Sequence, residues 1–265
     1  MAPVPWIEHV CAARLAARLG VADPEIVSGA RILGLDVRAE RPGGPRLIGS
    51  GAVAEEIIVA DGDEVVLLGY DTRAPRVDNL GRLPMAWIDP ATADHRSVLA
   101  AGEEALAEYA RALDEWRILT AAALAGLVEQ TMTVAAEFAK TRYTLGVPIG
   151  TLQAISHPLA NMAIVVQGGR NLSRRAAWFL DNEPDERPEL PGCAFVFMAA
   201  EAAQAATMAV HIQGGLGVST EAAATAYLVR ARGWPLVAGD PGQTAQAVGR
   251  IIAQRESAGD PAPAA

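Results

Sequence analysis

The sequence predicts an α+β protein that is mainly helical, in which a small antiparallel β-domain is followed by a C-terminal antiparallel bundle of the four-helix type. Short runs rich in β-branched residues fill residues 25–96, and glycine, proline and aspartate separate them. Long alanine-rich stretches of helical periodicity fill residues 97–256. With 265 residues, of which 51% are hydrophobic and 20% charged, the chain can bury a substantial core in one or two domains.

A single amphipathic helix is expected near the N-terminus, and we assign residues 1–24 to it. Between residues 5 and 20 apolar side chains recur at helical spacing, from Trp6 to Leu19, and Gly20 can end the helix. The first residues lack the basic stretch and apolar core of a signal peptide, and no later run reaches the length of a bilayer span. We therefore expect a cytoplasmic protein.

The next region, residues 25–96, is expected to form the small β-domain. Turn formers at 42–45 and 61–63 separate strand-like runs as hairpin loops do, which indicates antiparallel pairing. The runs with the composition of strands are 30–35, 56–60 and 64–68.

Residues 97–256 are expected to form the helical bundle. Alanine and leucine have high helix propensity, and alanine also allows helices to approach closely. The loop at 181–188 separates two of the helices, and residues 257–265 are expected to be a disordered tail. The predicted helical stretches are 97–141, 151–181, 191–214, 220–232 and 241–256.

Charge and residue pattern argue against two kinds of site. A net charge of −9 with a pI near 5.0 gives an acidic surface that repels nucleic-acid phosphates, and the 22 lysines and arginines form no dense basic block. Cys11 and Cys193 lie far apart and fit no metal-ligand spacing, and His95 and His157 are isolated. We expect neither a nucleic-acid partner nor a metal site, and we expect both cysteines to be reduced thiols.

Two segments of the predicted bundle carry a family resemblance. The first is residues 141–149, TRYTLGVPI, followed by Gln153 and by LANM at 159–162. The second is residues 211–221, HIQGGLGVSTE, followed by Tyr227 through Arg232. In order, spacing and residue type they resemble the helical C-terminal domain of the acyl-CoA dehydrogenases, flavoproteins that oxidise the Cα–Cβ bond of acyl thioesters. The resemblance also implies the chain order of helix, small β-domain and bundle.

The resemblance implies a flavin adenine dinucleotide (FAD) that lies across a subunit interface. Arg142 and Thr144 would reach the diphosphate of the neighbouring subunit's FAD, and arginine suits this role because its planar fork forms paired, charge-assisted hydrogen bonds. The glycine turn at 214–217 would bring backbone close to the cofactor, where a Cβ would obstruct contact. His211 stands where relatives commonly have a flavin-contacting glutamine. The predicted cofactor-binding residues are Arg142, Thr144, Leu145, Gln153, His211, Gln213, Gly214, Gly215 and Gly217.

Ordinary structural roles are the alternative for the same residues. Arg142 would then end a helix with a surface charge, and Gly214 with Gly215 would form a helix C-cap. The joint order and spacing of both segments favours cofactor contact over these roles.

The other half of a flavin site is missing from the sequence. Members of the family hold the flavin ring with a loop of the type Thr-Glu-Pro-x-x-Gly-Ser-Asp, and no such run occurs in this chain. The nearest Ser-Gly pairs, at Ser28 and Ser50, lack its context. The family's large N-terminal helical domain could survive only as a remnant, the helix assigned to residues 1–24.

No catalytic base is predicted. Abstraction of the α-proton of a thioester needs a carboxylate over the substrate, but Ala238 occupies the position of the usual glutamate and Trp116 that of the alternative base on an earlier helix. Glu115 is one residue off, about 100° away around the helix axis, and we expect it on a solvated face or in a salt bridge. Asp240 is nearer the usual loop, but its side chain is shorter and Pro241 stiffens its backbone, so it is only a weak surrogate.

These residues predict one subunit of a heteromeric FAD-dependent acyl-CoA dehydrogenase, resembling the non-catalytic chain of two-chain bacterial members that act on steroid side chains. It would contribute the diphosphate and adenosine half of the flavin site. A larger acyl-CoA dehydrogenase-like partner would supply the base, the ring contacts and the acyl thioester pocket, in a heterodimer or an α2β2 heterotetramer. The chain alone would then be no competent oxidoreductase. The alternatives are reuse of the fold for non-redox chemistry on a thioester or carrier-bound intermediate, and a cofactor-free structural subunit.

Overall fold

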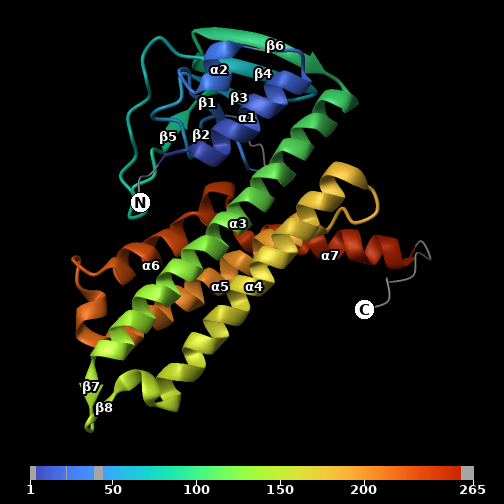
Figure 1. Cartoon of the computed structure of the whole chain (residues 1–265). Helices are drawn as coiled ribbons and strands as arrows, with labels where there is room; N and C mark the ends of the chain where they lie inside the picture. Colours follow the sequence, from blue (N-terminus) through green and yellow to red (C-terminus); the bar gives the residue numbers. More distant parts are fainter. Residues whose placement is uncertain (1–3, 22, 39–43, 258–265) are drawn as a thin grey trace. The chain divides into compact units, whose positions relative to one another are not determined.

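The computed structural model describes residues 4–21, 23–38 and 44–257, and it divides the chain into two compact units (Figure 1). Unit 1 comprises Met1–Trp116 with Val237–Gly239, and unit 2 comprises Arg117–Leu236 with Asp240–Ala265. The long helix α3 (Glu103–Thr141) begins in unit 1 and continues in unit 2. The division therefore falls inside a helix, which the sequence-based division at residue 97 does not anticipate. Most of the predicted tail, residues 258–265, lies outside the described residues.

Unit 1 begins with the predicted amphipathic helix, α1 (Trp6–Arg18). Its buried side chains, Cys11, Ala12, Leu15 and Ala16, recur at helical spacing and form the face that packs inward. A second helix, α2 (Pro24–Ser28), follows where the sequence suggests the start of the β-domain. Asp23 caps it by accepting a hydrogen bond from the Glu25 backbone N–H at 2.8 Å.

A four-stranded sheet with the strand order β1-β3-β4-β6 forms most of the β-domain. Its strands are β1 (Leu33–Leu35), β3 (Glu56–Asp61), β4 (Glu64–Gly69) and β6 (His95–Ala101). The predicted hairpin at 61–63 is confirmed, since β3 and β4 pair antiparallel around Gly62, whose φ is 62°. The expectation of purely antiparallel pairing is wrong for β1, which pairs parallel to β3. The segment between these two strands carries β2 (Arg46–Ile48), so the chain crosses over instead of turning back in a hairpin.

The start of the predicted bundle also differs from the expectation. Residues 97–101 lie in β6, which pairs antiparallel with β4, and helix α3 begins only at Glu103. Backbone pairing with the neighbouring strand overrides local helix propensity here. Strand β5 (Ala86–Ile88) pairs with β2 in a second small sheet, and a 3-10 turn, η1 (Pro90–Thr92), precedes β6.

The core of unit 1 lies between these strands. Apolar residues of β2, β3, β4 and β5 form one buried cluster. A buried ion pair adjoins the sheet, in which Arg46 Nη1 lies 3.3 Å from Asp36 Oδ2 and donates to the carbonyl of Ala60 at 3.0 Å. The Tyr109 hydroxyl from α3 donates to the Asp36 carbonyl at 2.5 Å, so the start of α3 is tied to the β-domain.

Unit 2 is the helical bundle, and its helices follow the predicted stretches closely. They are the remainder of α3, α4 (Gln153–Asn182), α5 (Leu190–Gln213), α6 (Ala223–Gly233) and α7 (Pro241–Ser257). Short elements connect them: β7 (Tyr143–Thr144), β8 (Val147–Pro148), η2 (Ile149–Thr151), η3 (Gly214–Val218) and η4 (Pro235–Ala238). The last two residues of η4 belong to unit 1. The mainly helical α+β fold class is confirmed.

Small residues set the packing of this bundle. Many of its fully buried residues are alanines, among them Ala125, Ala202 and Ala206. At Gly169 on α4 an added Cβ would lie 2.2 Å from the Met198 sulfur of α5. The absence of a side chain at Gly169 therefore lets α4 and α5 pack closely at this point.

The expectation that no run reaches the length of a bilayer span is wrong for two segments. Helix α3 and the segment Leu190–Val218 are both long and apolar enough to cross a membrane by length and composition. Alanine supplies much of this hydropathy, and 50% and 44% of the two apolar windows are buried in the fold. Core helices of soluble proteins have the same character.

Candidate functional site

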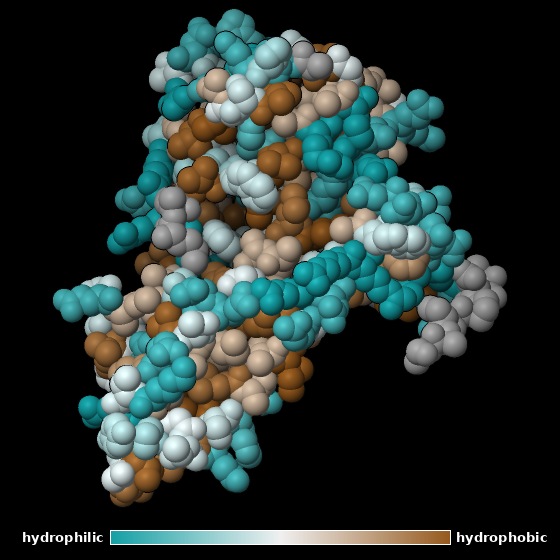
Figure 2. All heavy atoms as spheres, in the orientation of Figure 1, coloured by the Kyte–Doolittle hydropathy of each residue, from teal (hydrophilic) through white to brown (hydrophobic). Residues whose placement is uncertain are grey.

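A tight hairpin holds the first predicted segment at one end of unit 2. Strands β7 and β8 pair Tyr143 with Pro148 and Thr144 with Val147. The two turn residues, Leu145 and Gly146, have positive φ values of 50° and 79°, as a two-residue hairpin turn requires. Leu145 is 91% exposed, and Figure 2 shows apolar side chains at the tip of the unit where Figure 1 places this hairpin.

Arg142 lies at the base of this hairpin with its backbone fixed and its side chain exposed. Its N–H donates to the Phe138 carbonyl at 2.9 Å, and its carbonyl accepts from the Ile149 N–H at 2.8 Å. Among the described residues its guanidinium makes no hydrogen bond or ion pair. An exposed positive group without a counter-charge, on a backbone that is fixed in this way, is available to an anion.

Gln153 is the first residue of the long helix α4, four residues beyond Ile149. The helix has no side-chain cap at its N-terminus, where Leu152 precedes it. Gly150 packs against the Ala139 carbonyl near the end of α3, so the start of α4 lies close to the base of the hairpin. The positive end of the α4 dipole adds to the charge of Arg142 in this region.

The second predicted segment follows α5, and two of its glycines have structural reasons to be glycine. Gly214 caps α5 with φ 59° and ψ −137°, and at Gly217 an added Cβ would lie 2.3 Å from the Val210 carbonyl oxygen. Thr225 also donates its hydroxyl to the Gly217 carbonyl at 2.6 Å. Gly215 differs, because nothing lies within 4 Å of where its Cβ would stand. The helix-cap alternative is thus correct for Gly214, while Gly215 presents open backbone.

The two other members of this segment differ in exposure. His211 is exposed and lines a surface pocket of about 510 Å³ together with Ala203, Gln204, Thr207, Met208 and Arg232. Gln213 is only 8% exposed, and it and Gly217 are the two buried members of the predicted set. In Figure 1 the hairpin and the end of α5 lie towards the same end of unit 2, and residues flanking both belong to one apolar core. Cofactor contact by these residues stays a prediction.

The two family positions for a catalytic base lie in unit 1 and carry no carboxylate. Trp116 is 2% exposed, and Ala238 is half-buried at the end of η4. Beside Ala238, Val237 is 4% exposed and packs so tightly against Gly49 that an added Cβ there would lie 2.7 Å from its Cγ1. A buried apolar side chain, Val237, therefore lies next to Ala238, and Trp116 is itself a large buried side chain.

One carboxylate that the sequence analysis missed lies in these surroundings. Glu8 of α1 accepts a hydrogen bond from Trp116 Nε1 at 3.3 Å, and its Oε1 is 3.7 Å from the Cβ position of Gly49. Burial raises the pKa of Glu8, since few groups stabilise its charge. A sequence signal existed, because Glu8 shares the buried helical face of α1 with Cys11, Ala12 and Leu15.

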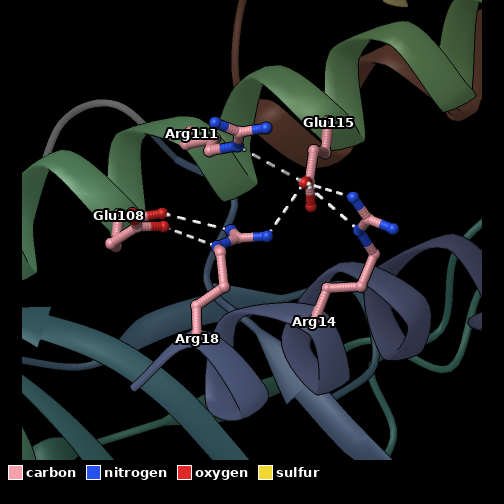
Figure 3. A network of polar contacts seen from close by, with 5 residues as sticks. All are labelled: Arg14, Arg18, Glu108, Arg111 and Glu115. Atoms are coloured by element: carbon pink, nitrogen blue, oxygen red, sulfur yellow. Dashed lines mark hydrogen bonds and ion pairs between the residues drawn. The ribbon is translucent and has the colours of Figure 1, made fainter. Parts of the chain in front are cut away.

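Glu115 is held in a network of arginines within unit 1 (Figure 3). Its Oε1 accepts from Arg14 at 3.1 Å and from Arg18 at 2.9 Å, and Arg111 approaches to 3.9 Å. Arg18 also pairs with Glu108 at 2.5 Å. The salt-bridge alternative is confirmed, and the solvated-face alternative is wrong because Glu115 is only 7% exposed.

Asp240, the weak surrogate base, caps a helix. It is exposed, and its Oδ1 accepts a hydrogen bond from the Gly242 N–H at 2.9 Å at the start of α7. Within the described ranges no group of three or more His, Cys, Asp or Glu residues has the arrangement to hold a metal ion. The cysteines are free thiols, with Cys11 buried and Cys193 half-buried.

Comparison with known proteins agrees with the arrangement of the helical unit. The family model described as the acyl-CoA dehydrogenase C-terminal domain matches residues 107–254. The chain belongs to the acyl-CoA dehydrogenase family. Homologous family members are FAD-dependent flavoproteins, and the matched region contains both predicted segments.

Individual relatives cover different parts of the chain. The mitochondrial short-chain specific acyl-CoA dehydrogenase of Sus scrofa is 36% identical over 123 residues, which are 46% of this chain and 30% of that enzyme. Acyl-CoA dehydrogenase FadE27 of Mycobacterium tuberculosis is 28% identical over 291 residues, covering 96% of this chain and 78% of FadE27. The ChsE4-ChsE5 complex of the same organism contains a chain with 27% identity and a TM-score of 0.78, covering 99% of this chain and 78% of that chain.

Proposed function

We propose that this chain is one subunit of a heteromeric FAD-dependent acyl-CoA dehydrogenase. It contributes the diphosphate and adenosine half of the flavin site, and a larger acyl-CoA dehydrogenase-like partner supplies the catalytic base. The observation that carries the proposal is Arg142, whose backbone is fixed at the base of the hairpin while its exposed guanidinium has no partner among the described residues. The assembly is a heterodimer or an α2β2 heterotetramer in the cytoplasm.

The donor set fits a diphosphate. Arg142 offers paired charge-assisted hydrogen bonds, Thr144 offers an exposed hydroxyl beside it, and the start of α4 adds the positive end of a helix dipole. Gly215 leaves backbone open to close approach. When bound, FAD accepts the hydride from the substrate. The residues of this chain bind and orient the end of the cofactor that is remote from that transfer.

Two observations support a partner subunit. Neither family position for the base carries a carboxylate, since they hold Trp116 and Ala238, so in the flavin-dependent reaction the partner chain would supply the base. The similar ChsE4-ChsE5 structure is itself a complex of two chains. The partner would also bind the acyl thioester, for which we propose a lipid or steroid acyl group.

The test is flavin content. The chain would be co-expressed with a larger acyl-CoA dehydrogenase-like protein, and the purified complex would be measured by flavin absorbance. We expect a yellow complex that loses most of its flavin on Arg142→Ala and part of it on Arg142→Lys, because lysine keeps the charge without the planar fork. Arg174→Ala, an exposed arginine on α4, is the matched control and should retain flavin.

Unchanged flavin content in Arg142→Ala would favour the cofactor-free structural subunit. If neither the chain alone nor any such complex is ever yellow, the proposed function fails.

One observation favours a second candidate, non-redox acid–base chemistry on a thioester or carrier-bound intermediate. Glu8 is a carboxylate with a raised pKa beside Trp116, in the surroundings of both family positions for the base. Turnover by the chain alone, without flavin, that disappears in Glu8→Gln would support this candidate. Absence of any such turnover leaves the flavin-dependent proposal as the better one.

A further inference from the structure

The imidazole of His9 joins three elements of unit 1. From α1, its Nδ1 lies 3.0 Å from the backbone nitrogen of Leu33 in β1, and its Nε2 lies 3.1 Å from the carbonyl oxygen of Ile26 in α2. Figure 1 shows α1, α2 and β1 together in this unit. A single side chain therefore ties two separate backbone segments to α1.

These two contacts determine which ring nitrogen of His9 carries the hydrogen. A backbone N–H can only donate and a carbonyl oxygen can only accept, so Nδ1 must accept from Leu33 and Nε2 must donate to Ile26. Only the neutral ring with its hydrogen on Nε2 satisfies both partners. A proton added to Nδ1 would face the Leu33 N–H, and both groups would then be donors.

The Leu33 N–H depends on this acceptor because of its place in the sheet. Leu33 is fully buried, and among the described strands β3 is the only one that pairs with β1. A buried N–H that loses its partner and cannot reach water costs free energy. Protonation of His9 therefore favours a state in which the start of β1 has moved away from α1.

No carboxylate is placed to stabilise a proton on His9. In the contacts of the described residues, the ring has only its two backbone partners. Arg31 pairs with Asp23 and with Glu56, and Glu55 pairs with Arg73. The carboxylates on the elements around His9 are those of Glu8, Asp23, Glu25, Glu55 and Glu56.

We propose that His9 is an acid-sensitive latch, whose neutral ring holds α2 and the start of β1 on α1 and whose protonation releases them. Histidine is the side chain that ordinarily changes its charge between pH 8 and pH 5. The released state takes up the proton and the latched state does not, so release becomes more favourable as pH falls. The latch depends neither on flavin nor on a partner subunit.

The effect of the latch is local, which separates it from the effect of Glu8. Burial raises the pKa of Glu8, so Glu8 contributes stability that is lost as pH rises. His9 acts in the opposite direction, and the two partly cancel in the stability of the whole unit. The latch must therefore be measured at the Leu33 N–H itself.

The experiment is amide hydrogen exchange of the full-length chain between pH 8 and pH 5, corrected at each pH for the intrinsic exchange rate. The reference is the Ala54 N–H, which donates to the Ser50 carbonyl at 2.9 Å, an acceptor that does not titrate. We expect the protection of Leu33 relative to Ala54 to fall at least about ten-fold towards pH 5, because a buried donor loses its partner.

His9→Gln should remove this pH dependence, since glutamine offers a donor and an acceptor but gains no proton. His95→Gln is the matched control, because its imidazole is exposed beside Asp71 in the same unit, and it should keep the wild-type trend. A Leu33 protection that changes no more than that of Ala54 overturns the latch, and so does a trend that persists in His9→Gln.

Nitrogen NMR of the wild-type ring at pH 8 tests the latch without any variant, in case His9→Gln does not fold. A hydrogen on Nε2 with a bare Nδ1 supports the latch. A hydrogen on Nδ1 overturns it, because Nδ1 could then not accept from Leu33.

Discussion

The indole of Trp116 donates its Nε1 hydrogen bond to the carboxylate of Glu8 across 3.3 Å, which joins α3 to α1 inside unit 1. The donor stands at the position where the family resemblance implies an alternative base, and the acceptor is a carboxylate on α1. The hydrogen bond favours the charged form of Glu8, but burial outweighs it, so the pKa of Glu8 is raised.

Glu8→Gln should make the protein more stable at high pH. The raised pKa means that the folded state holds the proton more tightly than the unfolded state does. The stability that protonation gives is therefore complete below the unfolded pKa and is lost as pH rises through the folded pKa. Glutamine stays neutral and still accepts from Trp116, so the variant should unfold at a higher temperature than the wild type at pH 8.

The difference should shrink towards pH 4, where the wild-type carboxyl becomes protonated. Thermal unfolding followed at several pH values measures it. Glu104→Gln, an exposed position at the start of α3, is the control and should show no such trend. A constant offset at all pH values would contradict the prediction.

Trp116→Phe should raise the pKa of Glu8 further. Phenylalanine fills most of the same space but donates no hydrogen bond to the carboxylate, so it removes one of the groups that lower this pKa. Titration of the Glu8 carboxyl by carbon NMR, assigned with Glu8→Gln, would follow the change. A midpoint that stays in place or falls would show that the hydrogen bond contributes nothing to the charge of Glu8.

Removing Glu115 should destabilise unit 1. Glu115→Ala leaves Arg14 and Arg18 facing each other without their shared carboxylate. Glu115 is buried but Arg14 is 54% exposed, so solvent screens part of the loss. We expect about 1–3 kcal/mol, between the values for exposed and buried pairs. Urea unfolding measures it, and Lys140→Ala, which breaks the exposed pair with Glu137, should cost less than about 1 kcal/mol.

The sequence could predict the helices of this fold because burial in a bundle follows the helical repeat. Alanine-rich periodicity located α4 and α5 to within two residues at each end. It could not locate β6 or the parallel pairing of β1 and β3, since both depend on strands distant in the chain. Local propensity contains no information on which edge of a sheet is left unpaired.

The candidate site divides in the same way. The motif around Arg142 predicted a segment that the structure forms as a hairpin with an exposed arginine, because turn geometry is local. The position of Glu8 on the inward face of α1 could have been predicted from the helical repeat, which places it on the same face as buried residues. Its hydrogen bond with Trp116 could not have been predicted, since the two residues are 108 positions apart and only the tertiary fold brings them together.

Two neighbouring glycines should separate a structural role from a cofactor role. Gly217→Ala would place a Cβ 2.3 Å from the Val210 carbonyl oxygen, and relieving this overlap should cost about 1–3 kcal/mol of stability. Gly215→Ala meets nothing within 4 Å, so the free chain should be as stable as the wild type, or slightly more stable because alanine restricts the unfolded chain.

If the Gly215 backbone approaches FAD in the complex, the same methyl group should lower flavin content. Urea unfolding of the free chain and flavin absorbance of the complex measure the two effects. A Gly215→Ala complex with full flavin content would remove Gly215 from the predicted site, because its exposed backbone would then have no close neighbour even in the assembled protein.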